Sequence, residues 1–210
     1  HGFLILAAMA ALAVLPRQVM ADSFLGTAED YAILAGTTVT NTGSSVINGN
    51  IGVYPGSTFT GMPPLVLATG TVHLADAAAL QAQTDLTAAY LALTGLPVTT
   101  VLTGTDLGGL TLTAGVYFFS SSAFLTGGLT LDFQGNPDAL FVFLIGSTLI
   151  TATSSSVTAI NTGGLSQSAA GCNVFWQVGS SATLGTTTSF MGHILALTSI
   201  TLDTGAVIVG

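Results

Sequence analysis

The stretch FVFLIGSTLITATSSSVTAI (residues 141–160) is the segment that most clearly indicates the fold. It opens with an apolar run, passes through a Ser/Thr corner, forms a second short run, and turns at Thr151-Ala152 into a third. β-Branched and aromatic residues favour strands, and glycine favours tight corners. Similar units of 19 or 20 residues begin at positions 115, 173 and 192. Three short strands per unit at this period are typical of one coil of a triangular β-solenoid.

The N-terminal third of the chain continues the same design. Its segments are YAILAGTTVTNTG (31–43), SSVINGNIGVYPG (44–56) and STFTGMPP (57–64). The alternative architecture is a β-sandwich, which needs hairpin turns of the Asn-Gly or Asp-Gly type. Asn48-Gly49 is the main such signal in the chain. We therefore favour the solenoid.

One segment, HLADAAALQAQTDLTAAYLALTGLP (73–97), differs because it is rich in Ala and Leu. Asp76 lies in the expected first turn of a helix, Gly95 can take a left-handed cap, and Pro97 stops continuation. An apolar stripe follows helical spacing and has to be buried along one face of the coils. The stripe consists of Ala75, Ala79, Ala82, Leu86, Ala89, Tyr90 and Leu93. The fold class predicted is all-β with one long helix packed alongside.

The N-terminus indicates export. Residues 3–15, FLILAAMAALAVL, form an apolar run followed by the small-residue site Val19-Met20-Ala21. This pattern predicts a signal peptide over 1–21, with a truncated start, that is cleaved after Ala21. The alternative is a membrane anchor, for which thirteen apolar residues fall short of the usual span. We expect residues 22–210 to form a single secreted, extracellular domain.

The composition excludes several classes of protein. The chain has 210 residues, one Lys or Arg, nine Asp or Glu and one cysteine. Arg17 lies within the predicted signal peptide, so the remainder carries no basic side chain to bind nucleic acid, phosphate or an anionic membrane. A single cysteine excludes an intrachain disulfide framework and a Cys-based zinc site. We expect a monomer that binds neither nucleic acid nor, after cleavage, a membrane.

The sequence gives little support for catalysis. His73 and His193 are far apart and belong to no metal-spacing motif. The acidic residues are scattered, which leaves a glycosidase pair open but unsupported. A calcium site at the turn near Asp132 and Asp138 is a weak alternative. We predict a protein that is not an enzyme and that uses no cofactor or metal.

The positive signal is an array of threonines at one corner of the repeats. Stacked coils bring equivalent residues about 4.8 Å apart, and β-branching fixes their χ1 angles. Outward threonines would then form a stiff lattice of methyl and hydroxyl groups that holds water in an ordered pattern without competing charges. The simpler interpretation is that Thr is a good strand former on an exposed face. Because ice is water in an ordered pattern, such an array would be suited to binding ice. The residues predicted to bind it are Thr126, Thr151, Thr153, Thr186, Thr188 and Thr204.

Three long stretches resemble the large microbial ice-binding (antifreeze) protein family with a discontinuous β-solenoid fold. They are residues 25–64, 112–149 and 172–206, and the run CNVFWQVGSSATLGT (172–186) is highly specific. The resemblance implies a right-handed triangular β-helix with a helix alongside and with its first coils stacked out of sequence order. It also implies a further C-terminal segment past Gly210, adsorption to ice crystals, and inhibition of ice growth and recrystallisation.

The family's motif is matched in part at the predicted corner and in full only at Thr158-Ala159-Ile160-Asn161, which lies one strand later and can be a coincidence. Some members carry Thr-Ala/Gly-x-Thr/Asn on a flat ice-binding face. The first two positions match at Thr126-Gly127, Thr151-Ala152 and Thr204-Gly205, but the fourth position departs in each. The alternative function is a structural or adhesive extracellular β-solenoid without ice affinity.

Overall fold

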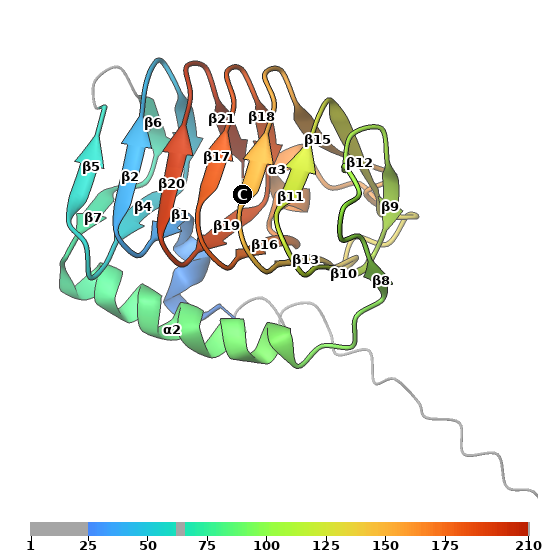
Figure 1. Cartoon of the computed structure of the whole chain (residues 1–210), viewed down its shortest axis with the longest axis horizontal. Coiled ribbons are helices and arrows are strands. Elements are labelled where there is room, and N and C mark those ends of the chain that lie inside the picture. The colour runs from blue at the N-terminus through green and yellow to red at the C-terminus, as the bar shows by residue number, and fades with distance from the viewer. Residues whose placement is uncertain (1–24, 62–65, 210) are drawn as a thin grey trace, which may run out of the picture.

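The computed structural model describes residues 25–61 and 66–209, which wind into right-handed coils with three flat sides (Figure 1). Each side is a sheet of parallel strands. This confirms the predicted triangular β-helix. The predicted signal peptide, residues 1–21, lies outside the described residues. Within the described part of the chain, no helix is long and apolar enough to cross a membrane.

Eight strands form the side that faces the long helix, here called sheet A. Each apolar run that opens a predicted unit becomes one of these strands, because both of its faces are buried. In spatial order the strands are β7 (Val72–Leu74), β4 (Asn50–Val53), β1 (Tyr31–Ala35), β19 (His193–Ala196), β16 (Val174–Val178), β13 (Phe141–Ile145), β10 (Gly115–Phe119) and β8 (Thr100–Val101).

Six strands form the second side, sheet B, which faces the viewer in Figure 1. Their inward residues are mostly apolar and their outward residues are mostly Ser or Thr. In spatial order they are β11 (Ala123–Leu125), β14 (Leu149–Thr151), β17 (Ala182–Leu184), β20 (Ser199–Leu202), β2 (Thr38–Asn41) and β5 (Thr58–Thr60).

Seven strands form the third side, sheet C. The short helix α3 (Gln167–Gly171) contacts β15, β18 and β21 of this sheet, where the Met191 side chain is buried. In spatial order the strands are β6 (Val66–Thr69), β3 (Val46–Asn48), β21 (Val207–Val209), β18 (Ser189–Met191), β15 (Ser156–Ile160), β12 (Gly128–Asp132) and β9 (Thr111–Thr113).

The coils are not stacked in sequence order. β1, near the N-terminus, pairs with β19 near the C-terminus, with Ile33 opposite Ile194. The second coil then extends the stack on the far side of β1, through β4. The expected out-of-order stacking is therefore confirmed. Asn48-Gly49, the potential hairpin signal, instead joins β3 to β4 at a corner, where Gly49 has φ +119°.

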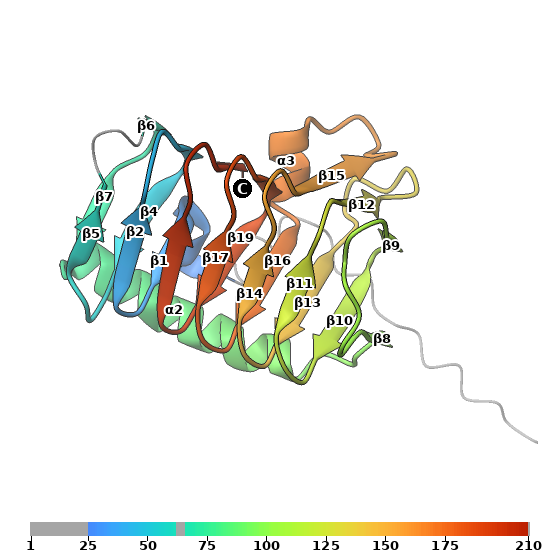
Figure 2. The same cartoon turned by 45° about the horizontal axis from the view of Figure 1, so that its top comes forward.

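Helix α2 (Ala77–Thr94) packs along sheet A, as predicted (Figure 2). Asp76 is its N-cap and accepts a hydrogen bond from the Ala79 N–H at 2.8 Å. Gly95 has φ −81°, so the predicted left-handed cap is wrong; its N–H instead bonds back to the last helical carbonyls. Two members of the predicted stripe also differ: Ala75 is exposed ahead of the helix and Tyr90 is half-buried.

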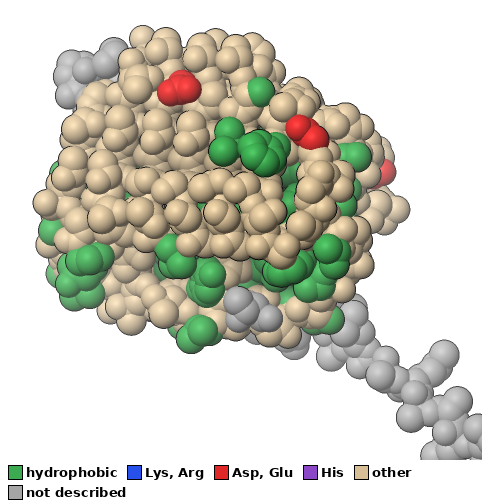
Figure 3. Space-filling view, viewed as in Figure 1, with side chains coloured by type: hydrophobic (Ala, Val, Ile, Leu, Met, Phe, Trp, Pro, Cys, Tyr) green, Lys and Arg blue, Asp and Glu red, His purple; other side chains and the backbone are tan. Residues whose placement is uncertain are grey.

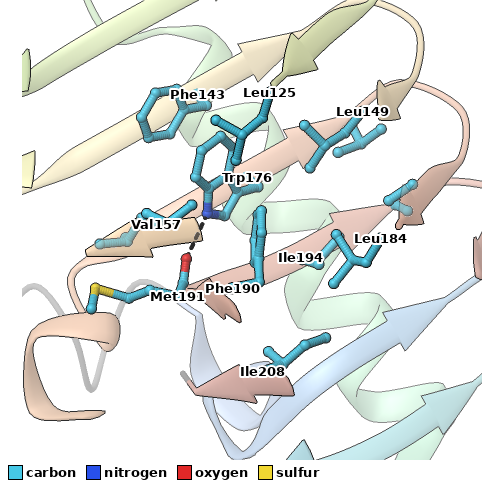
Figure 4. Packing of buried hydrophobic residues seen from close by; sticks show 14 of the residues in the cluster. Leu125, Phe143, Leu149, Val157, Trp176, Leu184, Phe190, Met191, Ile194 and Ile208 are labelled. Carbon is cyan, nitrogen blue, oxygen red and sulfur yellow. Dashed lines mark hydrogen bonds between the residues drawn. The ribbon is translucent and has the colours of Figure 1, made fainter. Parts of the chain in front are cut away.

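Two apolar layers hold these elements together. The first fills the triangular interior, where Trp176 stacks on Phe143 with ring centroids 3.9 Å apart (Figure 4). The Trp176 Nε1–H donates to the Met191 carbonyl at 2.9 Å, so the indole is buried without an unpaired donor. The second layer lies between α2 and sheet A and includes Leu86 and Leu144. Sheet B has no such covering layer among the described residues.

Candidate functional site

The outer face of sheet B carries two straight columns of side chains, to each of which every strand, or the residue just before it, contributes one member. Register places Thr201 opposite Thr183 on one side and Thr40 on the other. Neighbouring residues in a column are about 4.8 Å apart, and the two columns are about 7 Å apart along the strands. Column 1 is Ser122, Thr148, Ser181, Ser199, Thr38 and Thr58; column 2 is Phe124, Ile150, Thr183, Thr201, Thr40 and Thr60.

The hydroxyls of the two columns differ in their partners. In column 1, the Ser199 hydroxyl donates to Ser181 Oγ at 2.9 Å, and the Ser122 and Thr148 hydroxyls lie 2.7 Å apart. In column 2, the hydroxyls of Thr40, Thr183 and Thr201 have no partner among the described residues. Column 2 therefore presents hydroxyls that can bond to external water.

Charge is confined to the margin of this face. Figure 3 shows the face with few acidic and no basic side chains. Asp106 pairs with Phe124 at one end of column 2. Burial raises the pKa of Asp106, but hydrogen bonds from the N–H groups of Thr126 and Gly108 and from the Thr126 hydroxyl outweigh it and lower the pKa. Asp106 is thus held ionised, with its charge directed at Thr126 rather than across the columns.

Two of the six threonines predicted to contact ice are buried, so the prediction that they lie on the surface is wrong. Thr151 and Thr188 are 3% and 0% exposed, and their hydroxyls lie 2.9 Å apart inside the corner between sheets B and C. Thr151 Oγ1 also accepts from the Gly185 N–H, and Thr188 Oγ1 donates to the Ala152 carbonyl. These side chains satisfy backbone groups of the turn and do not contact anything outside the protein.

The other predicted threonines lie on the outside of this corner. Thr153 and Thr204 are exposed and Thr186 is half-buried. Hydrogen bonds from Ser154 N–H to the Thr186 carbonyl and from Thr187 N–H to the Thr204 carbonyl stack the three turns in register. Thr126 is exposed too, but it lies on the shorter turn of its own coil and its hydroxyl donates to Asp106. The structure thus brings Thr153, Thr186 and Thr204 into one line and leaves Thr126 outside it.

The columns of sheet B do not coincide with the recurring turn steps on which the predicted site is based. The signal for them was present in the Thr-x-Thr alternation of GTTVTNT (36–42) and STFT (57–60), whose period of two is that of a strand. The turn steps recur in the sequence because the turns share one backbone geometry. Ser154 and Thr187 have φ +59° and +55°, where Gly205 has +78°.

The described residues contain no group of three or more His, Cys, Asp or Glu side chains that could hold a metal. His193 is 2% exposed beneath the helix layer; its Nδ1 lies 3.3 Å from the Tyr31 carbonyl and its ring stacks on Phe175. Burial lowers its pKa despite that hydrogen bond. His73 bonds to Asp76 at the start of α2 and so braces the helix cap. Both histidines have structural contacts.

Comparison with known proteins gives a consistent result. A family model described as "Ice-binding-like" matches residues 33–210. An ice-binding protein from Nostoc sp. is 58% identical over 87% of this chain and 65% of its own length. Ice-binding protein 1 from Shewanella frigidimarina is 31% identical over 94% of this chain, which spans only 25% of that relative. The crystal structure of an ice-binding protein from the Antarctic ascomycete Antarctomyces psychrotrophicus has a TM-score of 0.74 and 36% identity, covering 89% of this chain and 97% of its own. The chain belongs to the ice-binding-like family.

Proposed function

We propose that this protein binds ice through the outer face of sheet B and so inhibits ice growth and recrystallisation. The observation that carries the proposal is the register of column 2, which lines up Thr183, Thr201, Thr40 and Thr60 on a face whose columns hold no charge. Sheet A is excluded as the contact surface because α2 covers it. Sheet C is less suited because α3 lies on it and because valines replace hydroxyls at β21 and β3.

The mechanism follows from the side chains of this face. Each hydroxyl can hold one water, while each neighbouring methyl restricts where the next water lies. β-Branching leaves threonine few rotamers, so little entropy is lost when the array orders water. Each contact is weak, but contacts on one rigid face form together and their effects combine. Adsorbed molecules then pin the ice front, and no catalytic group takes part.

The corner threonines extend this surface in our proposal. Thr153, Thr186 and Thr204 lie where sheet B turns into sheet C and are the part of the predicted site that faces outward. Thr126 is a weaker member because its hydroxyl is already bonded to Asp106. We expect these residues to add to binding less than column 2 does.

We further propose a secreted, non-enzymatic monomer whose residues 22–210 form one domain. Support comes from the predicted signal peptide and from the ice-binding relatives. The alternative, a structural or adhesive solenoid without ice affinity, is not favoured by those relatives. A structural or adhesive role also gives no reason for the hydroxyls of column 2 to lie in register and face solvent without protein partners.

Ice recrystallisation inhibition by the purified protein tests the proposal. We expect the parent to be active, Thr201→Tyr to abolish most of that activity, and Thr158→Tyr to leave it unchanged. Thr158 is a matched control because it is an exposed strand threonine on sheet C. A folded parent without activity would refute the function. Equal losses in both variants, or none in Thr201→Tyr, would refute the assignment to sheet B.

A further inference from the structure

Column 2 changes its chemistry partway along the solenoid. Ile150 lies opposite Thr183, and Phe124 lies opposite Ile150. Both occupy the outward position that threonine holds in β17, β20, β2 and β5, and they are 38% and 47% exposed. The next position along is Asp106. The column therefore passes from four threonines to two apolar side chains, and it ends there, with Asp106 beyond it at the margin of the face.

Ile150 and Phe124 cannot continue the surface that the threonines make. Neither has a hydroxyl to hold water. Phe124 is outward and 47% exposed, and its side chain is larger than threonine by a phenyl ring, so it forms a step in a column of otherwise smaller side chains. A flat crystal surface resting on the threonines of β20 and β2 would meet that step before it reached β11.

The neighbouring column does not show this change. Ser122 and Thr148 lie beside Phe124 and Ile150 and are hydroxylic like the rest of column 1. The backbone of β11 and β14 also stays in register with that of the following coils. The interruption is therefore caused by two side chains and not by a slip in strand register.

We infer that Phe124 and Ile150 form the boundary of the ice-contact area on the flat face of sheet B and confine the contact made by column 2 to the four coils that carry β17, β20, β2 and β5. This inference rests on the proposed function of sheet B. Phe124 and Ile150 would then set how large an area of sheet B can contact an ice crystal. The coils of β11 and β14 then carry the solenoid and its core but contribute little to adsorption.

Extending the column tests the inference. We expect the double variant Phe124→Thr/Ile150→Thr to reach the recrystallisation endpoint at a concentration at least about twofold lower than the parent. Twofold corresponds to about 0.4 kcal/mol, since tenfold corresponds to about 1.4 kcal/mol. Ile150→Thr alone should give a smaller gain because the Phe124 step remains. Ile160→Thr is the control: Ile160 is an exposed apolar residue on sheet C, 42% exposed, and its replacement should change nothing.

The outcomes separate the two claims. An inactive but folded parent refutes the proposed function and this boundary with it. An active parent whose double variant is unchanged or weaker, with an unaltered unfolding midpoint, refutes the boundary alone. A weaker double variant would show that the apolar pair itself contacts ice. If the double variant has a lower unfolding midpoint than the parent, the Ile150→Thr single variant is used in its place. An unchanged or weaker activity in that variant, with an unaltered midpoint, then refutes the boundary.

Discussion

Sheets A and B lie on adjacent sides of the same coils and share the same interior, yet they face different surroundings. On sheet A, the outward residues Leu144, Leu195 and Leu34 are apolar and pack beneath α2. On sheet B, the outward residues of the same coils include Ile150, Thr201 and Thr40, and nothing in the described chain covers them. The inward residues of both sheets are mostly apolar; Asn41 and Thr151, at the ends of β2 and β14, are the buried polar exceptions on sheet B.

This difference shows that the inward residues specify the solenoid and the outward residues specify what each side does. The helix layer on sheet A contributes burial of apolar side chains, which stabilises the fold. The open face of sheet B contributes almost none, so its side chains are free to be selected for contact with water or ice. Stability and binding are thus expected to separate by side, and the predictions below test that separation.

The largest effect is expected in the helix layer. Leu86 is 3% exposed between α2 and sheet A, so Leu86→Ala should lower the free energy of unfolding by about 2–5 kcal/mol. Leu80→Ala on the same helix is the control, because Leu80 is 44% exposed and should change stability by less than about 0.5 kcal/mol. Chemical denaturation measures both. Similar effects at the two positions would contradict the packing described for α2.

The corner threonines should show the next largest effect. Thr151→Val removes the acceptor of the buried Gly185 N–H and should destabilise the protein by about 1–3 kcal/mol. Thr153→Val, two residues along and exposed, should be nearly neutral for stability. Thr151→Val should leave ice activity of the folded protein unchanged. A loss of activity without a loss of stability in Thr151→Val would restore Thr151 to the contact surface.

The sequence predicted the solenoid, the helix and its buried stripe, because these depend on strand and helix periodicity that is read directly from the chain. It did not predict which threonines face outward. Thr151 is the last residue of β14, so the alternation of the strand turns it inward like Leu149, whereas Thr153 lies in the turn that follows and is exposed; where the strand ends is not marked in the sequence. The Gly95 cap was wrong for a related reason: a glycine permits a left-handed conformation but does not require it.

Lowering the pH should reduce the stability of the packing between α2 and sheet A before it affects the outer face of sheet B. Burial lowers the pKa of His193, so the unfolded chain binds a proton more readily. The stability from neutral His193 is fully present above about pH 6.5 and is lost as the pH falls towards its folded pKa. Hydrogen bonds from Thr27 lower the pKa of Asp85, which adds a second loss below about pH 4. Denaturation midpoints measured between pH 7 and pH 3 check this, and His193→Leu should remove the first step.

The columns of sheet B contain no titratable side chain, so ice activity per folded molecule should stay constant over that pH range. Activity is measured at each pH with the folded fraction determined in parallel. A change in activity per folded molecule within this range would show that a titrating group, such as Asp106 at the margin, takes part in binding.

The smallest effect is expected from Thr201→Val. Valine keeps the β-branched shape and one methyl of threonine while it removes the hydroxyl, and Thr201 has no hydrogen-bond partner among the described residues. Stability should change by less than about 0.5 kcal/mol, because nothing buried is lost. Activity should fall less than in Thr201→Tyr, since the face stays flat and only one of several anchored waters is lost. Recrystallisation endpoints for the two variants, measured beside Thr158→Val on sheet C, rank the contributions of shape and hydroxyl. If Thr201→Val lost as much activity as Thr201→Tyr, the hydroxyl and not the flatness of sheet B would decide binding at this position.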